Sequence, residues 1–408
     1  MPPMANPLKI GMILNEPPLA EKSAPARSHE AITHLIEANL NRAEGSPRDI
    51  DFKAFWMNSI DVAGDEKLCR SSFPSLASRF HFFDLHGHRS ILEKVDNRLR
   101  PMAFHASSGM RAAVKKALET HEIDILHVEQ AWMAYAVPRR FDPNRVLLSL
   151  QYLLATDFTA APPAEGFVEK TRRWRLLQAE LRMIRRFRHI RVLSHDMAES
   201  LRKLHPSAQI YVIPLAIDAL AYQFAPRPAN QSSPVVSVIG SMYWPPTRSA
   251  ASRMVTRLWP AIHQAIPSAR LQIVGRQAMQ YFAEFQGQNN IEIHENVPNI
   301  EPYFHGSNAL VYAPSAGSGM KVKVLEAMLQ GLPVITNHSG IEGLRVEHGY
   351  DCLIAETDDE FIRQTIELLN NPTQAETIAL QARALVKSQC DPQMIYHKTS
   401  DVYHKMAR

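Results

Sequence analysis

The sequence predicts an α/β fold with two doubly wound domains, each built around a parallel β-sheet. Short apolar runs alternate with longer segments of helical periodicity along almost the whole chain, and this alternation is typical of βαβ units. The apolar runs are mostly continuous, as expected of parallel strands that are buried on both faces. A length of 408 residues also fits two domains better than one.

The expected strands fall into two series along the chain. Residues 225–234, APRPANQSSP, separate the series and are rich in proline, alanine and serine without apolar periodicity, as in an interdomain linker. We therefore predict one domain in residues 1–225 and a second that begins at residue 226. The first series comprises residues 8–14, 52–57, 80–85, 123–128, 146–150, 190–193 and 210–215, and the second comprises 235–240, 271–275, 291–294, 309–313, 333–336 and 352–355.

The composition excludes several classes of protein. Lys and Arg number 45 against 41 Asp and Glu, and the net charge of +4 argues against a wholly polybasic nucleic-acid binder. Cys69, Cys352 and Cys390 lie far apart and outside any CxxC or Cys/His spacing, which argues against a disulfide framework and a structural zinc site. Because the first residues lack a long apolar core and no apolar run reaches about 18 residues, we expect neither export nor membrane spanning. We expect a cytoplasmic protein.

The most informative segment is residues 312–343, YAPSAGSGMKVKVLEAMLQGLPVITNHSGIEG, which is predicted to form a strand, a glycine loop, a helix and a strand. The loop leaves backbone amides accessible before a helix that begins near Met320 and ends at Gly331, a residue suited to the left-handed position after a helix. Lys321 and Lys323 then fall in the first helical turn, where cations oppose the helix dipole unless an anion is bound there. The pattern predicts a phosphate or diphosphate site.

Three other interpretations compete for this segment. The glycines could simply form a tight turn, and Lys323 and Glu326 could form an ordinary surface ion pair. A P-loop is excluded at this position, because GxxxxGK[ST] is absent, and GxGxxG is absent as well.

The same segment carries a family resemblance. GSGMKVKVLEAMLQGLPVITNHSGIEGL resembles the donor-site signature of retaining GT-B glycosyltransferases of family four, the glycosyl transferases group 1, in the branch with GxKxKxLEA. SVIGSMYWPPTRSAASRM, VLSHDMAESL and VIPLAIDAL also resemble segments of that family. The similarity extends from about residue 120 to the end, whereas the first hundred residues resemble only a generic Rossmann-like half. It implies two Rossmann-like domains facing each other across a cleft: an N-terminal acceptor-side domain, a nucleotide-sugar donor domain in residues 226–391, and a final helix in 392–408 that packs back on the N-terminal domain.

The resemblance implies roles for donor-site residues. Glu326 matches the second glutamate of the family's E-x7-E motif, whose carboxylate accepts hydrogen bonds from the ribose hydroxyls. Ser318, Gly319, Met320 and Lys321 would hold the diphosphate and the transferring sugar. Ser318 stands where the motif has its first glutamate, so the motif is incomplete.

Further donor-site residues are expected at the strand ends of the second domain. The family commonly places Arg and Lys after the glycine that ends the first strand, but here Ser241 follows that glycine, and Arg248 is the nearest cation. Arg276 is the other candidate cation for the leaving diphosphate, although either arginine could be a solvated loop residue. The set expected at these strand ends is Gly240, Ser241, Arg248, Gly275, Arg276 and Val297.

The acceptor side is expected in the N-terminal half. DILHVEQAW matches a strand end at which family members often carry an HxH or HxE pair, and it contains His127, Glu129 and Gln130. A histidine on an apolar strand is more often a core residue, whereas Glu129 at the end of the strand is expected to face the cleft. Gln151 stands where relatives carry histidine, and the loop after the first strand lacks the family's glycines. The expected catalytic residues are Lys321, Glu129 and Arg276.

Residues 169–191 contain eight arginines together with apolar residues at helical spacing, and they are predicted to form one basic amphipathic helix. Such a helix either docks its apolar stripe on the sheet and solvates its arginines, or attracts the protein to an anionic bilayer. No aromatic stacking platform accompanies the arginines, so nucleic acid is not expected. We expect weak membrane association, at the inner face of the plasma membrane.

These observations predict a retaining, metal-independent glycosyltransferase that moves a sugar from a UDP- or GDP-sugar to an acceptor hydroxyl, in polysaccharide, glycoconjugate or glycolipid synthesis. The acceptor would be a carbohydrate, a lipid-linked molecule or a protein. No bound cofactor and no metal site are expected. One alternative is a catalytically silent GT-B subunit that binds nucleotide-sugar or a partner enzyme, and another is a phosphorylase-like or epimerase-like GT-B protein.

Overall fold

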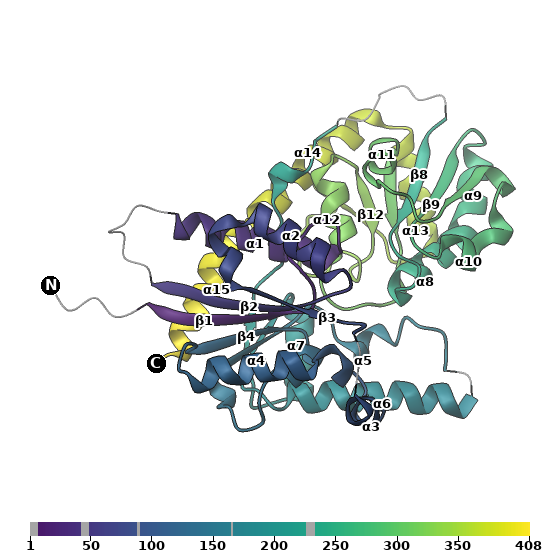
Figure 1. The fold of residues 1–408 in the computed structure, drawn as a ribbon. Helices are drawn as coiled ribbons and strands as arrows, with labels where there is room; N and C mark the ends of the chain where they lie inside the picture. Colours follow the sequence, from purple (N-terminus) through teal and green to yellow (C-terminus); the bar gives the residue numbers. More distant parts are fainter. Residues whose placement is uncertain (1–6, 42–48, 88–89, 165, 226–232) are drawn as a thin grey trace. The chain divides into compact units, whose positions relative to one another are not determined.

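The computed structural model describes residues 7–41, 49–87, 90–164, 166–225 and 233–408 (Figure 1). The chain forms two compact units. The first contains Met1–Leu154, Ala164–Ile217 and Pro392–Arg408, and the second contains Ala155–Pro163 and Asp218–Asp391. Most of the linker predicted at 225–234 lies outside the described residues.

The first unit contains a seven-stranded parallel sheet in the order β3-β2-β1-β4-β5-β6-β7. The strand order reverses between β1 and β4, so the carboxyl ends of these two strands lie at the switch point of a doubly wound sheet. Helices cover both faces, and Figure 1 shows α1 and α4 on opposite sides of the sheet. The strands are β1 (Leu8–Leu14), β2 (Ile50–Ser59), β3 (Phe80–Asp84), β4 (Ile125–Glu129), β5 (Val146–Leu150), β6 (His189–Val192) and β7 (Gln209–Val212), and the helices are α1 (Ala24–Leu40), α2 (Val62–Ser72), α3 (Ile91–Leu99), α4 (Ser108–Glu119), α6 (Gly166–Ile184), α7 (His195–Leu204) and α15 (Pro392–Met406).

The second unit contains a six-stranded parallel sheet in the order β10-β9-β8-β11-β12-β13. It repeats the doubly wound pattern, with the strand order reversing between β8 and β11. A short helix, α5 (Leu154–Asp157), leads from the first unit into the excursion that joins the second. The strands are β8 (Val235–Ile239), β9 (Arg270–Val274), β10 (Ile291–His294), β11 (Ala309–Tyr312), β12 (Val334–Thr336) and β13 (Leu353–Ile354), and the helices are α8 (Pro245–Arg253), α9 (Trp259–Ala265), α10 (Ala278–Phe282), α11 (Glu301–His305), α12 (Val322–Leu329), α13 (Asp358–Leu369) and α14 (Pro372–Gln389).

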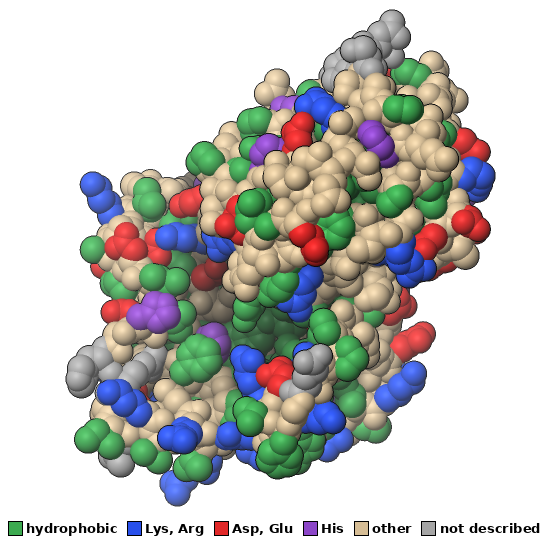
Figure 2. Space-filling view, turned by 90° about the vertical axis from the view of Figure 1, so that its right-hand side faces the viewer, with side chains coloured by type: hydrophobic (Ala, Val, Ile, Leu, Met, Phe, Trp, Pro, Cys, Tyr) green, Lys and Arg blue, Asp and Glu red, His purple; other side chains and the backbone are tan. Residues whose placement is uncertain are grey.

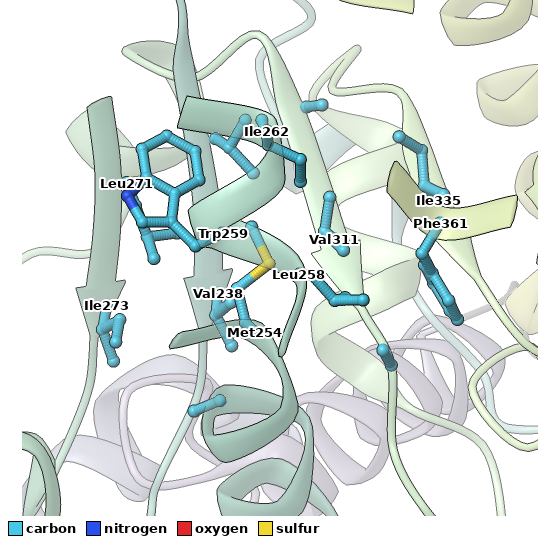
Figure 3. Packing of buried hydrophobic residues seen from close by; sticks show 14 of the residues in the cluster. Val238, Met254, Leu258, Trp259, Ile262, Leu271, Ile273, Val311, Ile335 and Phe361 are labelled. Atoms are coloured by element: carbon cyan, nitrogen blue, oxygen red, sulfur yellow. The ribbon is translucent and has the colours of Figure 1, made fainter. Parts of the chain in front are cut away.

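The predicted fold class is confirmed. Every strand expected from the sequence is present, with bounds that differ by at most three residues. The physical reason is burial on both faces, because apolar runs without polar interruptions can only be strands or helices covered on all sides. Figure 3 shows one such layer in the second unit, where Trp259, Leu258 and Met254 pack on Val238, Leu271 and further strand residues of one buried cluster.

We predicted that the chain passes from the first unit to the second once, after residue 225. The structure instead shows an earlier boundary and an additional excursion into the second unit. Asp218–Asp391 begins earlier, because residues 218–224 pack on the second unit: the Arg383 guanidinium donates to the carbonyl oxygens of Ala219 and Tyr222, and Phe224 packs against Gly331. Ala155–Pro163 also joins the second unit, through a hydrogen bond of Asp157.

The prediction of one helix over residues 169–191 is wrong for its last seven residues. The helix α6 ends at Ile184, and Arg191 belongs to β6. The reason is strand pairing: Arg191 in β6 lies between Ser149 of β5 and Tyr211 of β7, and the Arg186 guanidinium donates to the carbonyl oxygens of Val137 and Pro138. These arginines therefore stabilise the first unit's interior. None of the helices in the described part of the chain is both long and apolar enough to span a membrane.

Two glycines allow the first strands of the second sheet to end side by side. Gly240 and Gly275 have φ of +138° and +152°, which L side chains rarely adopt, and a Cβ at Gly275 would overlap the carbonyl group of Gly240. The backbones after β8 and β9 are joined there by a hydrogen bond from the Met242 amide to the Arg276 carbonyl oxygen, 2.9 Å long. Glycine at position 275 is thus required by space as well as by conformation.

We predict that Gly275→Ala lowers the free energy of unfolding of the second unit by about 3 kcal/mol, because the new Cβ meets backbone that cannot move without breaking this contact. Gly349→Ala is the matched control: Gly349 has φ of +81° but open space around it, so the cost is conformational alone, about 1 kcal/mol. Denaturant unfolding measures both values. Equal losses for the two variants would contradict the steric explanation.

Candidate functional site

The glycine loop and the start of α12 form the centre of the site predicted in the second unit. Gly317 and Gly319 have φ of +150° and +74°, and the backbone of Lys321 is still extended, with φ of −94° and ψ of 92°. The helix therefore begins at Val322. The prediction that both lysines lie in the first turn is wrong for Lys321, which is the residue preceding the helix, and it is confirmed for Lys323.

Lys321 holds the loop from inside. Its ammonium group donates hydrogen bonds to the carbonyl oxygens of Ser318, 3.2 Å away, and Gly319, and it lies 3.7 Å from the Glu342 carboxylate. Burial lowers the pKa of Lys321, and the negative charges of Glu342 and Asp157 oppose that effect. Lys321 thus ties its own loop to a buried carboxylate.

Asp157 holds the same loop from another part of the sequence. Its Oδ1 accepts hydrogen bonds from the Ser318 amide at 2.7 Å and from the Ser318 hydroxyl at 2.9 Å. Burial raises the pKa of Asp157 to about 6, even though both of these hydrogen bonds lower it. The structure therefore places a carboxylate beside Ser318, the position at which the family motif carries glutamate.

Glu326, the residue expected to bind ribose, is buried in α12. Its Oε1 accepts a hydrogen bond from the Tyr222 hydroxyl, 3.2 Å away. Tyr222 precedes β8 in the segment that packs on α12 and α14, so a distant part of the sequence orients this carboxylate. Gly331 ends the helix with φ of +78°, as predicted.

Lys323 points toward the end of β8. Its Nζ donates a 2.8 Å hydrogen bond to the Thr247 hydroxyl on α8 and lies 4.7 Å from the centre of the Tyr312 ring. Its side-chain stem passes so close to Gly240 that a Cβ there would overlap it. Burial and the positive charge of Lys321 lower the pKa of Lys323 to about 7, and the negative charge of Glu326 opposes both effects.

The remaining donor-site candidates differ in their surroundings. Gly240 and Gly275 lie against each other, and Ser241 follows in the same loop. The Arg248 guanidinium lies over the Tyr281 ring, 4.6 Å from its centre, so it is already engaged within the unit. Arg276 is exposed, and Val297 is partly exposed in the loop after β10.

In the first unit the acceptor-side candidates lie in a buried charge cluster. Glu129 ends β4, and its carboxylate lies 3.3 Å from His127 Nε2, 3.7 Å from His29 Nε2 and 3.6 Å from an Arg191 nitrogen. Gln151 donates to it over 3.3 Å. Burial would raise the pKa of Glu129, but the nearby His127 and His29 side chains outweigh it and hold the pKa well below its usual range. Glu129 is thus a buried anion with several partners.

The C-terminal helix completes this cluster. The Tyr403 hydroxyl on α15 lies 2.6 Å from His127 Nδ1, and burial lowers the pKa of His127. His127, Glu129 and Gln151 border a small cavity of about 30 Å³, together with residues of α1 and α15. Gln130 is buried with φ of +76° and does not border this cavity.

Sequence reasoning missed several residues of both clusters. Asp157 and Tyr222 lie far from residue 318 in sequence, and only Arg191 carried a signal, as one member of the arginine-rich segment. A carboxylate two residues after a histidine on a strand shares its face, which is the one cue that connects His127 with Glu129. The missed residues are His29, Asp157, Arg191, Tyr222, Thr247, Glu342 and Tyr403. In the described part of the chain, no group of three or more His, Cys, Asp and Glu residues is arranged to hold a metal ion.

Residues 233–371, which contain the glycine loop, α12 and all six strands of the second sheet, match the model of a protein family described as glycosyl transferases group 1. The resemblance to glycosyl transferases group 1 is therefore confirmed over residues 233–371. A comparison with curated protein sequences found no match.

Solved structures share the fold over nearly the whole chain. Sucrose-phosphate synthase from Thermosynechococcus elongatus is 15% identical, with 98% of this chain and 99% of that chain covered and a TM-score of 0.68. HepE from Anabaena, solved with UDP and glucose, is 15% identical, with 98% and 100% covered and a TM-score of 0.62. A variant of TarM from S. aureus, solved with fondaparinux, α-GlcNAc-glycerol and UDP, is 9% identical, with 97% and 99% covered and a TM-score of 0.64. The GT-B fold is confirmed.

We predict that Asp157→Asn is more stable than the wild type at pH 7, by about 2 kcal/mol, and that the difference shrinks at pH 5. The folded protein binds a proton at Asp157 more tightly than the usual carboxyl group does, so wild-type stability rises as the pH falls through 6, whereas asparagine gains nothing. Asparagine keeps the Oδ1 acceptor for Ser318. Denaturant unfolding at both pH values tests this, with the exposed Asp401→Asn as control. A constant difference between pH 7 and pH 5 would contradict it.

Proposed function

We propose that this protein is a retaining, metal-independent glycosyltransferase that moves a sugar from a UDP- or GDP-sugar to an acceptor hydroxyl. The observation that carries the proposal is the arrangement of the glycine loop, α12 and Glu326 within the domain that matches the group 1 family. UDP in the structures of HepE and TarM supports a nucleotide-sugar donor.

The donor site combines a carboxylate that binds the ribose with a loop that binds the diphosphate. The Glu326 carboxylate, oriented by Tyr222, accepts hydrogen bonds from the two ribose hydroxyls. The Gly319 amide and the start of α12 provide donors and a positive dipole end for the diphosphate, whereas the Ser318 N–H already donates to Asp157. The buried contacts of Lys321 with the loop keep these amides in place before the substrate arrives.

The reaction requires mainly stabilisation of charge on the leaving group. As the bond from the anomeric carbon to the diphosphate breaks, negative charge gathers on the phosphate, and preorganised donors at the loop lower the energy of that state. The leaving phosphate accepts the proton of the acceptor hydroxyl on the same face, so the configuration at the anomeric carbon is retained. The exposed Arg276 supplies a further cation to the departing diphosphate.

The acceptor side is proposed at the carboxyl ends of β1, β4 and β5, where ligands of doubly wound sheets bind. Glu129, His127 and Gln151 border the small cavity there, and Glu129 is held as an anion by its partners. A hydroxyl-bearing acceptor for polysaccharide, glycoconjugate or glycolipid synthesis suits such acceptor atoms. The glycan ligands of the TarM structure support this class.

A catalytically silent subunit is the second candidate, and Ser318 in place of the motif's glutamate favours it. Slow hydrolysis of the donor sugar by the isolated protein separates the two functions. A glycosyltransferase transfers the sugar to water at a low rate, whereas a silent subunit releases none.

We predict that one of UDP, GDP and ADP, or one of their sugars, raises the melting temperature of the wild type and that Glu326→Ala loses most of this shift, because ligand that binds the native state stabilises it by mass action. Thermal shift and calorimetry provide the measurement. Glu376→Ala, on the exposed face of α14, is the matched control and keeps the shift. Failure of every nucleotide to bind the wild type would favour the silent-subunit function without a donor.

We also propose that α6 and α3 attach the protein weakly to an anionic membrane. Phe167, Val168 and Trp174 are exposed on α6, by 84%, 81% and 61%, beside basic residues such as Lys170 and Arg172. The Arg175 guanidinium joins α6 to α3 by donating to the Arg98 and Leu99 carbonyl oxygens, and α3 exposes Ile91, Val95 and Leu99. In Figure 2 hydrophobic and basic side chains are interleaved over the lower part of the face shown. Exposed aromatic residues between cations suit a lipid interface.

We predict that the wild type sediments with vesicles containing anionic lipid at low salt and that the double variant Lys170→Glu with Arg182→Glu reduces the partition coefficient by about tenfold or more, since each basic residue near such a surface contributes about 1 kcal/mol. Both residues are exposed on α6. The matched control reverses two exposed lysines of α4, Lys115→Glu with Lys116→Glu. Absence of wild-type binding at low salt would dispose of the membrane proposal.

A further inference from the structure

The two lysines of the glycine loop and α12 have different surroundings. An ammonium group has three N–H donors. Those of Lys321 face two carbonyl oxygens of the loop and the Glu342 carboxylate, and the side chain is buried. Within the protein, the N–H donors of Lys321 therefore have acceptors and its positive charge has a nearby carboxylate.

The ammonium group of Lys323 has fewer hydrogen-bond acceptors and less compensating charge around it. Its Nζ donates to one neutral acceptor, the Thr247 hydroxyl, and otherwise lies over the face of Tyr312. In the described part of the chain, no carboxylate lies within 4.0 Å of this ammonium group. The side chain is only partly buried, so solvent still reaches it. Among the described residues, Lys323 thus has one hydrogen-bond acceptor and no carboxylate partner, and solvent reaches its ammonium group.

The position of Lys323 is set by two backbones. It lies in the first turn of α12, where the helix dipole is positive, and its stem passes over Gly240 at the end of β8. Because Gly240 has no side chain, the ammonium group reaches the strand end directly. A strand end and a helix start therefore meet at one cation, an arrangement that suits a phosphate group.

We propose that Lys323 is the side chain that contacts the leaving diphosphate and that Lys321 is a positioning residue for the glycine loop. This inference rests on the proposed function. The sequence analysis had assigned the phosphate contact to Lys321. The protein thereby separates two tasks: one lysine is neutralised within the fold and fixes the loop amides, and the other remains available to the substrate.

The charged and titratable groups around Lys323 make its binding proton-linked. Lys321 precedes it in the loop, Glu326 follows on α12, and Tyr312 faces it from β11 with a pKa that burial raises far above neutrality. The pKa of Lys323 is lowered to about 7, so roughly half of the molecules carry the proton at pH 7 before ligand binds. A bound diphosphate raises that pKa, and binding therefore takes up protons and weakens as the pH rises above 7.

The test is calorimetric titration of the full chain with UDP and with inorganic pyrophosphate, each in two buffers of different ionisation enthalpy at pH 7. We expect the wild type to take up about half a proton per ligand. Lys323→Met should bind about tenfold more weakly or worse and take up no proton. Lys323→Arg should bind within about threefold of the wild type, also without proton uptake, because arginine is always charged. Lys387→Met, an exposed lysine of α14, should match the wild type.

Two further measurements separate contact from structure. Without ligand, Lys323→Met should melt at or above the wild-type temperature at pH 7, because methionine removes a charge that lacks a partner, whereas Lys321→Met should melt lower. Per bound ligand, Lys321→Met should retain proton uptake.

The outcomes distinguish this inference from the proposed function. Unchanged affinity and proton uptake in Lys323→Met, with both lost in Lys321→Met, would overturn the assignment while leaving the proposed function standing. Binding of pyrophosphate through Lys323 without any nucleotide would support the anion contact and overturn the nucleotide-sugar donor. Failure of the wild type to bind either ligand would overturn both.

Discussion

The second unit depends on the way in which one glycine loop is held before α12. Two charged side chains are buried to hold it, Lys321 from the loop itself and Asp157 from a segment about 160 residues earlier. Burial shifts the pKa of each group toward the neutral form, because taking a charge out of water costs free energy. These buried contacts fix the loop amides before any ligand binds, and fixed donors stabilise developing charge better than mobile ones.

The first unit uses the same principle for a different group. Glu129 is buried at a strand end and remains an anion because two histidines, Arg191 and Gln151 surround it. Tyr403 of the last helix contacts His127, so the C-terminal end of the chain contributes to the surroundings of a residue near position 129. Removing one member of such a network leaves the others buried without partners. The Tyr403–His127 contact therefore helps to hold α15 in place, and α15 in turn orients His127.

How well the sequence predicted each feature follows from the range of the interaction involved. The strands were predicted because apolar runs report burial residue by residue, and Gly331 was predicted because the left-handed conformation is a local property. The start of α12 was placed too early because Lys321 has good helical propensity, but its side chain is drawn back to the loop carbonyls. The arginine-rich segment was extended too far as a helix because the helical periodicity of residues 169–184 was continued to Arg191, although residues 190–193 were also predicted to form a strand.

By itself the sequence determined the α/β class, the two series of strands, the glycine loop before a helix and the family resemblance of the second domain. These are properties of neighbouring residues, since hydrophobic pattern, turn chemistry and motif spacing act over a few positions. Only the tertiary structure decided which groups surround each charge. The hydrogen bonds between Asp157 and Ser318, Tyr222 and Glu326, and Tyr403 and His127 join residues more than a hundred positions apart. The tertiary structure also decided that a carboxylate lies near Lys321 and that none lies near Lys323 among the described residues. Such pairings depend on which strand ends and helices meet in space, and no local pattern in the chain encodes that meeting.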